Sequence, residues 1–218
     1  MTRLRLFSSG TATLALLLAA CGGGPVQPDW QNDAHQSLNS FSAAYLSGNA
    51  RVAEAEFKRA RSDLARTGRF DLVARAELVR CGIEVASLEF NDCPGFATLA
   101  PDAGPAENAY AAFLLGKTTD AVLLPEQYRR VTDGGSSQGV LASIDAPLSR
   151  LIAAGVLLRT GRLDPAGIAL AVDTASAQGW RRPLLAWLEL QARQAEGAGD
   201  RNTAAQARRR AELVGGSR

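Results

Sequence analysis

Side chains that commonly bind metals or act as nucleophiles are scarce in this chain, whose 218 residues include one His and three Cys. The sequence contains no H-E-x-x-H motif and no cysteine pair with zinc spacing, so we expect no metal site. It also lacks a Walker loop and a G-x-G-x-x-G motif placed after a strand, and we therefore expect no cofactor. On motif grounds we assign no catalytic, cofactor-binding or metal-ligating residue.

One segment matches the consensus sequence of a hydrolase motif but lacks the structural context that the motif requires. Residues 135–139 read G-x-S-x-G, in which Ser137 would be the nucleophile of an α/β-hydrolase. That motif needs a buried strand before it, whereas residues 128–133 are polar, and it needs a later histidine, whereas the single His35 is far upstream. We interpret residues 132–139 as a plain loop and His35 as a surface or boundary residue of a helix.

A net charge is also lacking once the first twenty residues are set apart. The whole chain has 24 Lys plus Arg against 22 Asp plus Glu, but Arg3 and Arg5 lie in that segment, which leaves 22 of each sign. A neutral chain has no overall field that attracts a polyanion, so we expect no nucleic-acid partner. The densest basic cluster, residues 208–210, spreads around a helix, and we interpret it as part of a solvated terminal helix.

No apolar run near the N-terminus is long enough to cross a membrane. The run at residues 14–20 is too short for ~30 Å of hydrocarbon, and polar residues 8–11 interrupt the stretch before it. A basic start at Arg3 and Arg5, a short apolar run and a small-residue cleavage site together form the pattern of a secretory signal. We therefore predict that residues 1–20 are a cleaved signal peptide.

The end of this signal, Leu18-Ala19-Ala20-Cys21, resembles a bacterial lipobox. The resemblance implies that the Cys21 thiol receives diacylglycerol and that the chain is cut just before it. Because Gly22 follows where Asp would favour inner-membrane retention, the resemblance also implies an outer-membrane lipoprotein that faces the periplasm. The Gly- and Pro-rich residues 22–28 would then be a flexible tether that holds the folded body at most ~25 Å from the membrane.

Two cysteines remain once Cys21 carries lipid. Cys81 and Cys93 form an even pair, and the bacterial periplasm is oxidising enough to join them, so we expect a disulfide. Closing a loop of this size stabilises a fold by about 3 kcal/mol in the chain-entropy view. A catalytic or metal-binding pair is the rival interpretation, but C-x11-C is neither a metal nor a redox spacing.

Apolar residues recur with a helical period through most of the remaining chain. The first such stretch ends at Gly48 and has its apolar positions at Trp30, Ala34, Leu38, Phe41 and Tyr45. The same period predicts helices over residues 53–64, 73–90, 106–115, 143–159, 165–177, 181–196 and 201–213, with one or two further turns from residue 125. No stretch alternates as a strand would. We expect a single all-α domain over residues 29–218, with irregular loops near 91–105 and 117–139.

A helical-repeat pattern follows the first of these turns. After Gly48 come Ala53, Phe57 and Ala60, at offsets that resemble the second helix of a tetratricopeptide repeat. The resemblance implies antiparallel helices that approach closely at the small residues, with Phe57 filling the gap to the next pair. The offsets recur less completely after two later turns, at Gly161, Ala166, Leu170 and Asp173, and at Gly199, Ala204, Arg208 and Ala211. An irregular helical bundle remains the alternative architecture.

These observations favour binding over catalysis. The leading hypothesis is a lipid-anchored periplasmic helical-repeat scaffold that binds protein or peptide partners in envelope biogenesis or maintenance. The alternative is an enzyme or accessory factor of peptidoglycan or envelope metabolism, for which Glu84, Glu89 or Glu107 would have to converge in space. Trp180 and Trp187 share a helical face, where core packing is the default and an exposed anchor for a partner is the alternative.

Substitution of Cys21 tests the predicted anchor. We expect Cys21→Ser to abolish lipidation and to leave an unprocessed or unanchored protein, because this thiol would be the only acyl acceptor. Mass spectrometry and membrane fractionation of the wild type and the variant measure this. A mature wild-type protein without the mass of lipid at Cys21, or one that fractionates as soluble, would refute the lipoprotein hypothesis.

Overall fold

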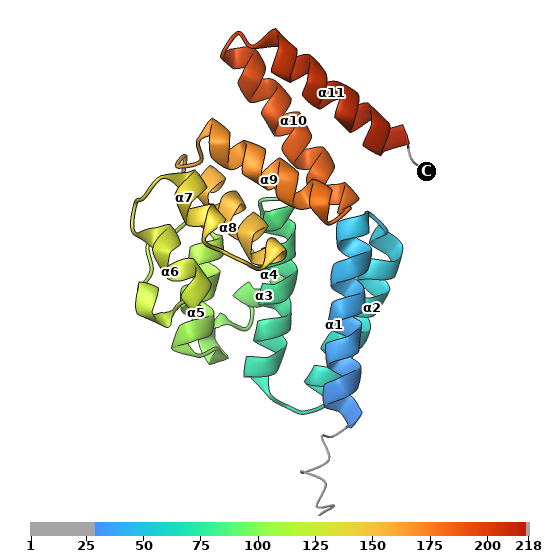
Figure 1. Cartoon of the computed structure of the whole chain (residues 1–218). Helices are drawn as coiled ribbons and strands as arrows, with labels where there is room; N and C mark the ends of the chain where they lie inside the picture. The colour runs from blue at the N-terminus through green and yellow to red at the C-terminus, as the bar shows by residue number, and fades with distance from the viewer. Residues whose placement is uncertain (1–28, 217–218) are drawn as a thin grey trace, which may run out of the picture.

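The computed structural model describes residues 29–216 (Figure 1). The expected cleavage site, the expected lipidation site at Cys21 and the expected tether lie outside these described residues. Within residues 29–216 the chain forms eleven α-helices and two 3-10 helices without a strand, so the predicted all-α class is confirmed. No helix among them is both long enough and apolar enough to span a membrane.

Along the sequence, long helices at both ends of the described chain flank a middle region of short ones. The N-terminal part consists of α1 (Asp29–Ser47), α2 (Ala50–Ala65) and α3 (Phe70–Ala86). The middle region comprises α4 (Pro94–Ala97), η1 (Ala100–Asp102), α5 (Pro105–Leu114), η2 (Ala121–Leu123), α6 (Glu126–Thr132) and α7 (Ser137–Ala142). The C-terminal part consists of α8 (Pro147–Arg159), α9 (Pro165–Ala177), α10 (Arg181–Gly197) and α11 (Arg201–Gly216).

The N-terminal hairpin has the register that its sequence predicts. Gly48 adopts a left-handed φ of 91° in the turn, and the Asn49 side chain accepts a hydrogen bond from the Val52 amide at the start of α2. The Phe41 and Phe57 rings then meet between α1 and α2, with their centroids 5.0 Å apart. Phe57 is 2% exposed, and the two alanines of the repeat-like pattern are buried on the same face of α2.

Helix α3 occupies the centre of the molecule, where it contacts α1, α2, α5 and α8. Its closest approach is to α8, at Gly155. A Cβ atom at this glycine would lie 2.5 Å from the Val85 carbonyl oxygen, so only a glycine permits the two backbones to pack at this distance. Every residue from Leu151 to Leu157 on α8 is buried. The pair α3 and α8 therefore forms the core around which the shorter helices are arranged.

Arginines on and after α8 fix the irregular middle region by donating hydrogen bonds to backbone carbonyls. Carbonyls that end short helices or lie in loops have no helical partner, so each must find another donor. The donor and acceptor pairs are Arg159 with Asn91 and Leu114, Arg150 with Leu141 and Ile144, and Arg162 with Val131, at distances of 2.9 to 3.3 Å. These side chains connect four separate segments to the α3–α8 core.

Three predicted boundaries are wrong, each for a local reason. Helix α3 ends at Ala86 and not at residue 90, because the chain must turn back there for Cys93 to reach Cys81; Leu88 adopts a left-handed φ of 60° in this turn. The expected loop at residues 132–139 contains the start of α7, which the Ser136 hydroxyl caps. Helix α8 begins at Pro147 and not at residue 143, since proline suits the first helical turn.

The contacts between distant helices favour the irregular bundle over a linear stack. In a solenoid each repeat contacts only its neighbours, whereas here α1 packs against α10. Arg182 on α10 makes much of this contact, because its Nε donates to the Tyr45 carbonyl oxygen at 3.1 Å and its guanidinium lies over the Tyr45 ring. Only the α10–α11 hairpin extends away from the remaining helices in Figure 1.

The cysteine pair lies at a separation that fits the predicted disulfide. The Cα atoms of Cys81 and Cys93 are 5.4 Å apart, and the bridge ties α3 to the loop that follows it. We expect neither thiol to react with an alkylating reagent until the purified protein is reduced, because both residues are buried as well as joined. Mass spectrometry after alkylation measures this, and modification of both cysteines without prior reduction would contradict the disulfide.

Truncation of Phe57 tests the packing of the N-terminal hairpin. We expect Phe57→Ala to destabilise the protein by about 3 to 5 kcal/mol, since it removes a buried ring and leaves a cavity beside Phe41. The matched control is Arg209→Ala on the exposed face of α11, which should change stability by no more than ~0.5 kcal/mol. Denaturant unfolding of the two variants side by side decides the matter: equal stability would refute the register of α2.

Candidate functional site

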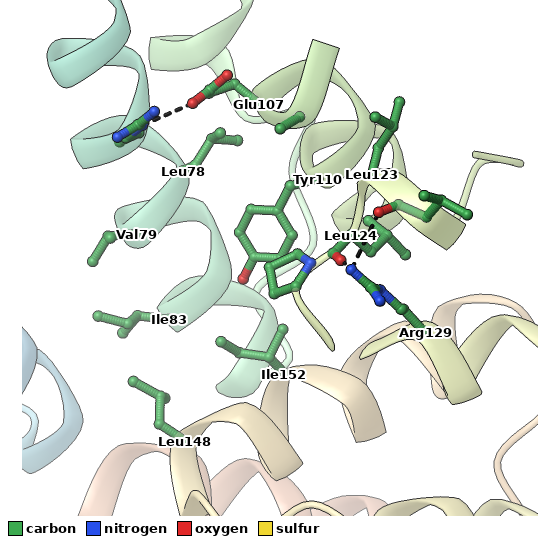
Figure 2. Close-up of a pocket in the computed structure, with 14 residues that line it drawn as sticks. Leu78, Val79, Ile83, Glu107, Tyr110, Leu123, Leu124, Arg129, Leu148 and Ile152 are labelled. Atoms are coloured by element: carbon green, nitrogen blue, oxygen red, sulfur yellow. Dashed lines mark hydrogen bonds and ion pairs between the residues drawn. The ribbon is translucent and has the colours of Figure 1, made fainter. Parts of the chain in front are cut away.

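The strongest candidate for a binding site is an apolar cleft of about 510 Å³ between α3, α5, η2 and α8 (Figure 2). We call it the apolar cleft. Its lining residues are mostly aliphatic, with charged side chains only at the rim. They are Arg75, Leu78, Val79, Ile83, Ala106, Glu107, Tyr110, Val122, Leu123, Leu124, Pro125, Arg129, Leu148 and Ile152.

Two walls of this cleft come from segments that lie far apart in the sequence. Helix α3 supplies the exposed Val79 and the buried Ile83, which also packs against the α1–α2 hairpin, and Leu123 of η2 lies on the opposite side of the cleft (Figure 2). Val122 of η2 also lines the cleft. Val122 is 73% exposed and Leu123 is 40% exposed. Apolar side chains gathered around one opening at this exposure provide a surface whose burial by a ligand is favourable.

Tyr110 lines the cleft and belongs to a rigid aromatic cluster. Its ring stacks on the Tyr128 ring with centroids 5.6 Å apart. The Phe113 ring packs against the Tyr128 ring as well, with centroids 5.0 Å apart. Burial raises the pKa of Tyr110 well above its usual value, and the neighbouring Tyr128 adds to this shift. The hydroxyl also hydrogen-bonds with Tyr128, which ties this wall of the cleft to the aromatic cluster.

The rim carries one ion pair and one arginine that positions the wall. Arg75 donates from Nε to Glu107 at 2.7 Å, and this hydrogen bond lowers the pKa of Glu107 although burial acts in the opposite direction. Arg129 donates to the carbonyl oxygens of Leu124 and Val122, at 3.1 and 3.3 Å. Because these bonds fix the segment that carries Val122 and Leu123, Arg129 determines the shape of the opening.

A second, polar cleft of about 590 Å³ lies between α2, α3 and the disulfide loop. Its charges are already paired within the protein. Arg61 donates to Glu77 at 2.7 Å, and Arg80 contacts both Glu84 and Glu54, at 3.1 and 3.2 Å. A Cβ atom at residue 95 would overlap the Glu77 carboxylate, so a glycine there lets this network pack against the loop. The network accounts for these side chains as structural ion pairs.

The three carboxylates that an envelope-cleaving enzyme would need do not converge on one site, although Glu84 and Glu89 both raise the pKa of Tyr45. Glu84 lines the polar cleft, where it accepts hydrogen bonds from Arg80 and Asn91. Glu107 lies at the rim of the apolar cleft, and Glu89 accepts a hydrogen bond from Arg182 at 2.7 Å beside α10. Each carboxylate thus pairs with a different arginine in a different depression of the surface.

The residues of the hydrolase-like motif also have structural contacts. Ser137 is buried at the start of α7, and its hydroxyl accepts a hydrogen bond from the Asp164 amide at 3.1 Å, next to α9. His35 lies exposed on α1, where Asn39 contacts its ring nitrogen at 3.1 Å. The serine and the histidine are therefore on different helices, each with its own partner.

The remaining sequence candidates act as packing and surface residues. Trp187 is completely buried, and its indole N–H donates to the Ala86 carbonyl oxygen at 3.0 Å, at the end of α3. Trp180 is half-buried against the core at the start of α10. Of the arginine cluster, Arg208 pairs with Glu196 at 2.5 Å between α11 and α10. Core packing is thus the role of Trp187.

Motif reasoning missed the apolar cleft because no motif encodes it. The only signal in the sequence was an apolar run at residues 121–124, inside a segment otherwise interpreted as an irregular loop. That run forms η2 and one wall of the cleft.

Within residues 29–216 no group of three or more His, Cys, Asp or Glu side chains is arranged to hold a metal ion. Comparisons with known proteins add no assignment: no family model matches the chain, and neither a curated protein nor a solved structure matches it.

Proposed function

We propose that this protein is a lipid-anchored scaffold that faces the periplasm from the outer membrane and binds protein or peptide partners. The observation that carries the binding role is the apolar cleft, in which exposed aliphatic side chains surround one opening. The proposed location rests on the lipobox-like residues 18–21. Together they describe a binding module that a lipid holds at the membrane during envelope biogenesis or maintenance.

The chemistry of the cleft indicates what such a partner must offer. Val79, Val122 and Leu123 would be buried by apolar side chains on one face of a helix or an extended segment, which is a common way of recognising peptides. Glu107 and Arg75 already neutralise each other at the rim, so shape and apolar area, more than charge, select the partner. The Tyr110 hydroxyl already hydrogen-bonds with Tyr128, so its ring adds mainly apolar area to the cleft.

The enzyme alternative has less support. Glu84, Glu89 and Glu107 lie apart, and the polar cleft contains ion pairs between side chains of the protein itself. A role as an accessory factor of peptidoglycan metabolism remains compatible with the scaffold, since an accessory factor also acts by binding.

Site-specific photocrosslinking in intact envelopes tests the proposed site. We expect a photoreactive residue at Val122 to give a discrete adduct with a partner, because this side chain stands at the opening of the cleft. The matched control is the same residue at Val52, which is 41% exposed on α2 but lies outside the cleft. The control should give no such adduct.

A second substitution shows whether the adduct depends on the cleft. Val79→Asp places a charge on the opposite wall at a partly exposed position, so the fold should persist while burial against a partner becomes unfavourable. We expect the Val122 adduct to fall about tenfold or more in this variant. An equal adduct at Val52, or one that Val79→Asp leaves unchanged, would contradict binding in the cleft.

A further inference from the structure

One end of the molecule combines an exposed phenylalanine and a half-buried tryptophan with the start of the described chain. Helix α1 begins there at Asp29, and the turn between α2 and α3 lies at the same end (Figure 1). The register of the hairpin supports this placement. Trp30 is eleven residues before Phe41 and Gly68 is eleven residues after Phe57, so both lie about 16 Å along the antiparallel helices from the Phe41–Phe57 contact.

We call this surface the anchor-proximal end; it comprises residues 29–30 of α1 and residues 66–72 of the α2–α3 turn. Phe70 is 56% exposed at the first residue of α3, although its neighbours on the inner side of the helix are buried. Trp30 is half-buried and packs against the N-terminal core, as does Leu72. Two aromatic rings therefore lie at the end of the body where the tether joins it.

The charges at this end do not indicate a polyanionic partner. Arg69 donates two hydrogen bonds to Asp71, at 3.2 and 2.8 Å, and Arg66 pairs with Asp63. Asp29 adds a further negative charge. A surface with paired charges, one protruding Phe ring and one half-buried Trp ring matches the interface of a phospholipid bilayer, where Trp lies among the headgroups and Phe reaches the headgroup–acyl boundary.

The length of chain before Asp29 limits how far this end can be from a membrane. If Cys21 carries lipid, residues 22–28 span at most ~25 Å when fully extended, and far less on average. A tether this short gives the nearest surface of the body a high effective concentration at the bilayer, so weak insertion of two side chains becomes significant. Other exposed apolar residues, such as Val52, lack this proximity to the anchor.

We propose that the anchor-proximal end docks on the phospholipid bilayer, with Phe70 and Trp30 inserted at the headgroup level. This proposal rests on the lipid anchor of the proposed function. Docking fixes the orientation of the body, because α3 runs from the bilayer into the core. It also places the rim of the apolar cleft near the membrane, since Arg75 is five residues, or about 7.5 Å, along α3 from Phe70.

Quenching of tryptophan emission by brominated lipid tests this docking. The lipidated mature protein, purified from membranes, is reconstituted in phosphatidylcholine vesicles with or without brominated acyl chains. The difference between the wild type and Trp30→Phe isolates the emission of Trp30 from that of Trp180 and Trp187, which lie on or beside α10. We expect bromination to reduce the Trp30 emission about twofold and to leave the emission of Trp30→Phe nearly unchanged.

A matched pair of variants reports on the turn itself. Phe70→Trp places an indole at the anchor-proximal end, where Phe70 is 56% exposed, and Val52→Trp places one near the other end of α2, where Val52 is 41% exposed. In a Trp30→Phe background, we expect brominated lipid to quench the first about twofold and the second hardly at all. Brominated vesicles should quench the emission of the Phe70→Trp indole equally at low and high salt, because paired charges do not drive the docking.

The outcomes separate the docking from the anchor. Protein that floats with the vesicles but shows no quenching of Trp30 or of the Phe70→Trp indole overturns the docking. The two rings would then be available to contact a protein partner. Protein that lacks lipid and fails to float overturns the anchor. In that case Cys21, the only thiol outside the disulfide, is coupled to a maleimide lipid, and the same quenching measurement decides the docking.

Discussion

The close contact of Gly155 with the backbone of Val85 is the constraint on which the rest of this fold depends. It brings α3 and α8 together without an intervening layer of side chains, so both helices become buried on most sides. Dense packing of two central helices leaves little room for adjustment, because protein interiors are filled like crystals. The α1–α2 hairpin packs against α3 of this pair, whereas α10 packs mainly against α9 and also against α1. Trp187 connects α10 to α3 by donating to the Ala86 carbonyl oxygen at the end of α3.

The arginine side chains solve the problem that this core creates. Helices as short as α6 and α7 expose many carbonyl groups relative to their length, and an unpaired buried carbonyl is unfavourable by about 1 to 3 kcal/mol. Arg150, Arg159 and Arg162 supply donors from a rigid base on α8 and the turn after it. Arg129 does the same for η2. The irregular middle region is therefore ordered by side chains that a charge count treats as surface residues.

Local patterns in the sequence predicted the long helices, because an apolar stripe and a glycine turn are local properties. Helices α1, α2, α9, α10 and α11 follow their periods closely. The separation of Cys81 and Cys93 was equally predictable from the pairing. The early end of α3 could not be predicted from a local period, because it follows from the turn that brings Cys93 back to Cys81. The apolar cleft was missed for a similar reason: its walls come from α3 and η2, about forty residues apart, and no local period brings them together.

Helix α3 shows how one element can serve the fold and the proposed functions together. Its buried faces carry Cys81 and Val85 into the core, while Val79 is 38% exposed at the apolar cleft. Its first residue, Phe70, is 56% exposed at the end of the molecule where the described chain starts. A helix fixed along its length by α8 and the disulfide transmits the position of one end to the other. An anchor at this end would therefore orient the cleft as well as localise the protein.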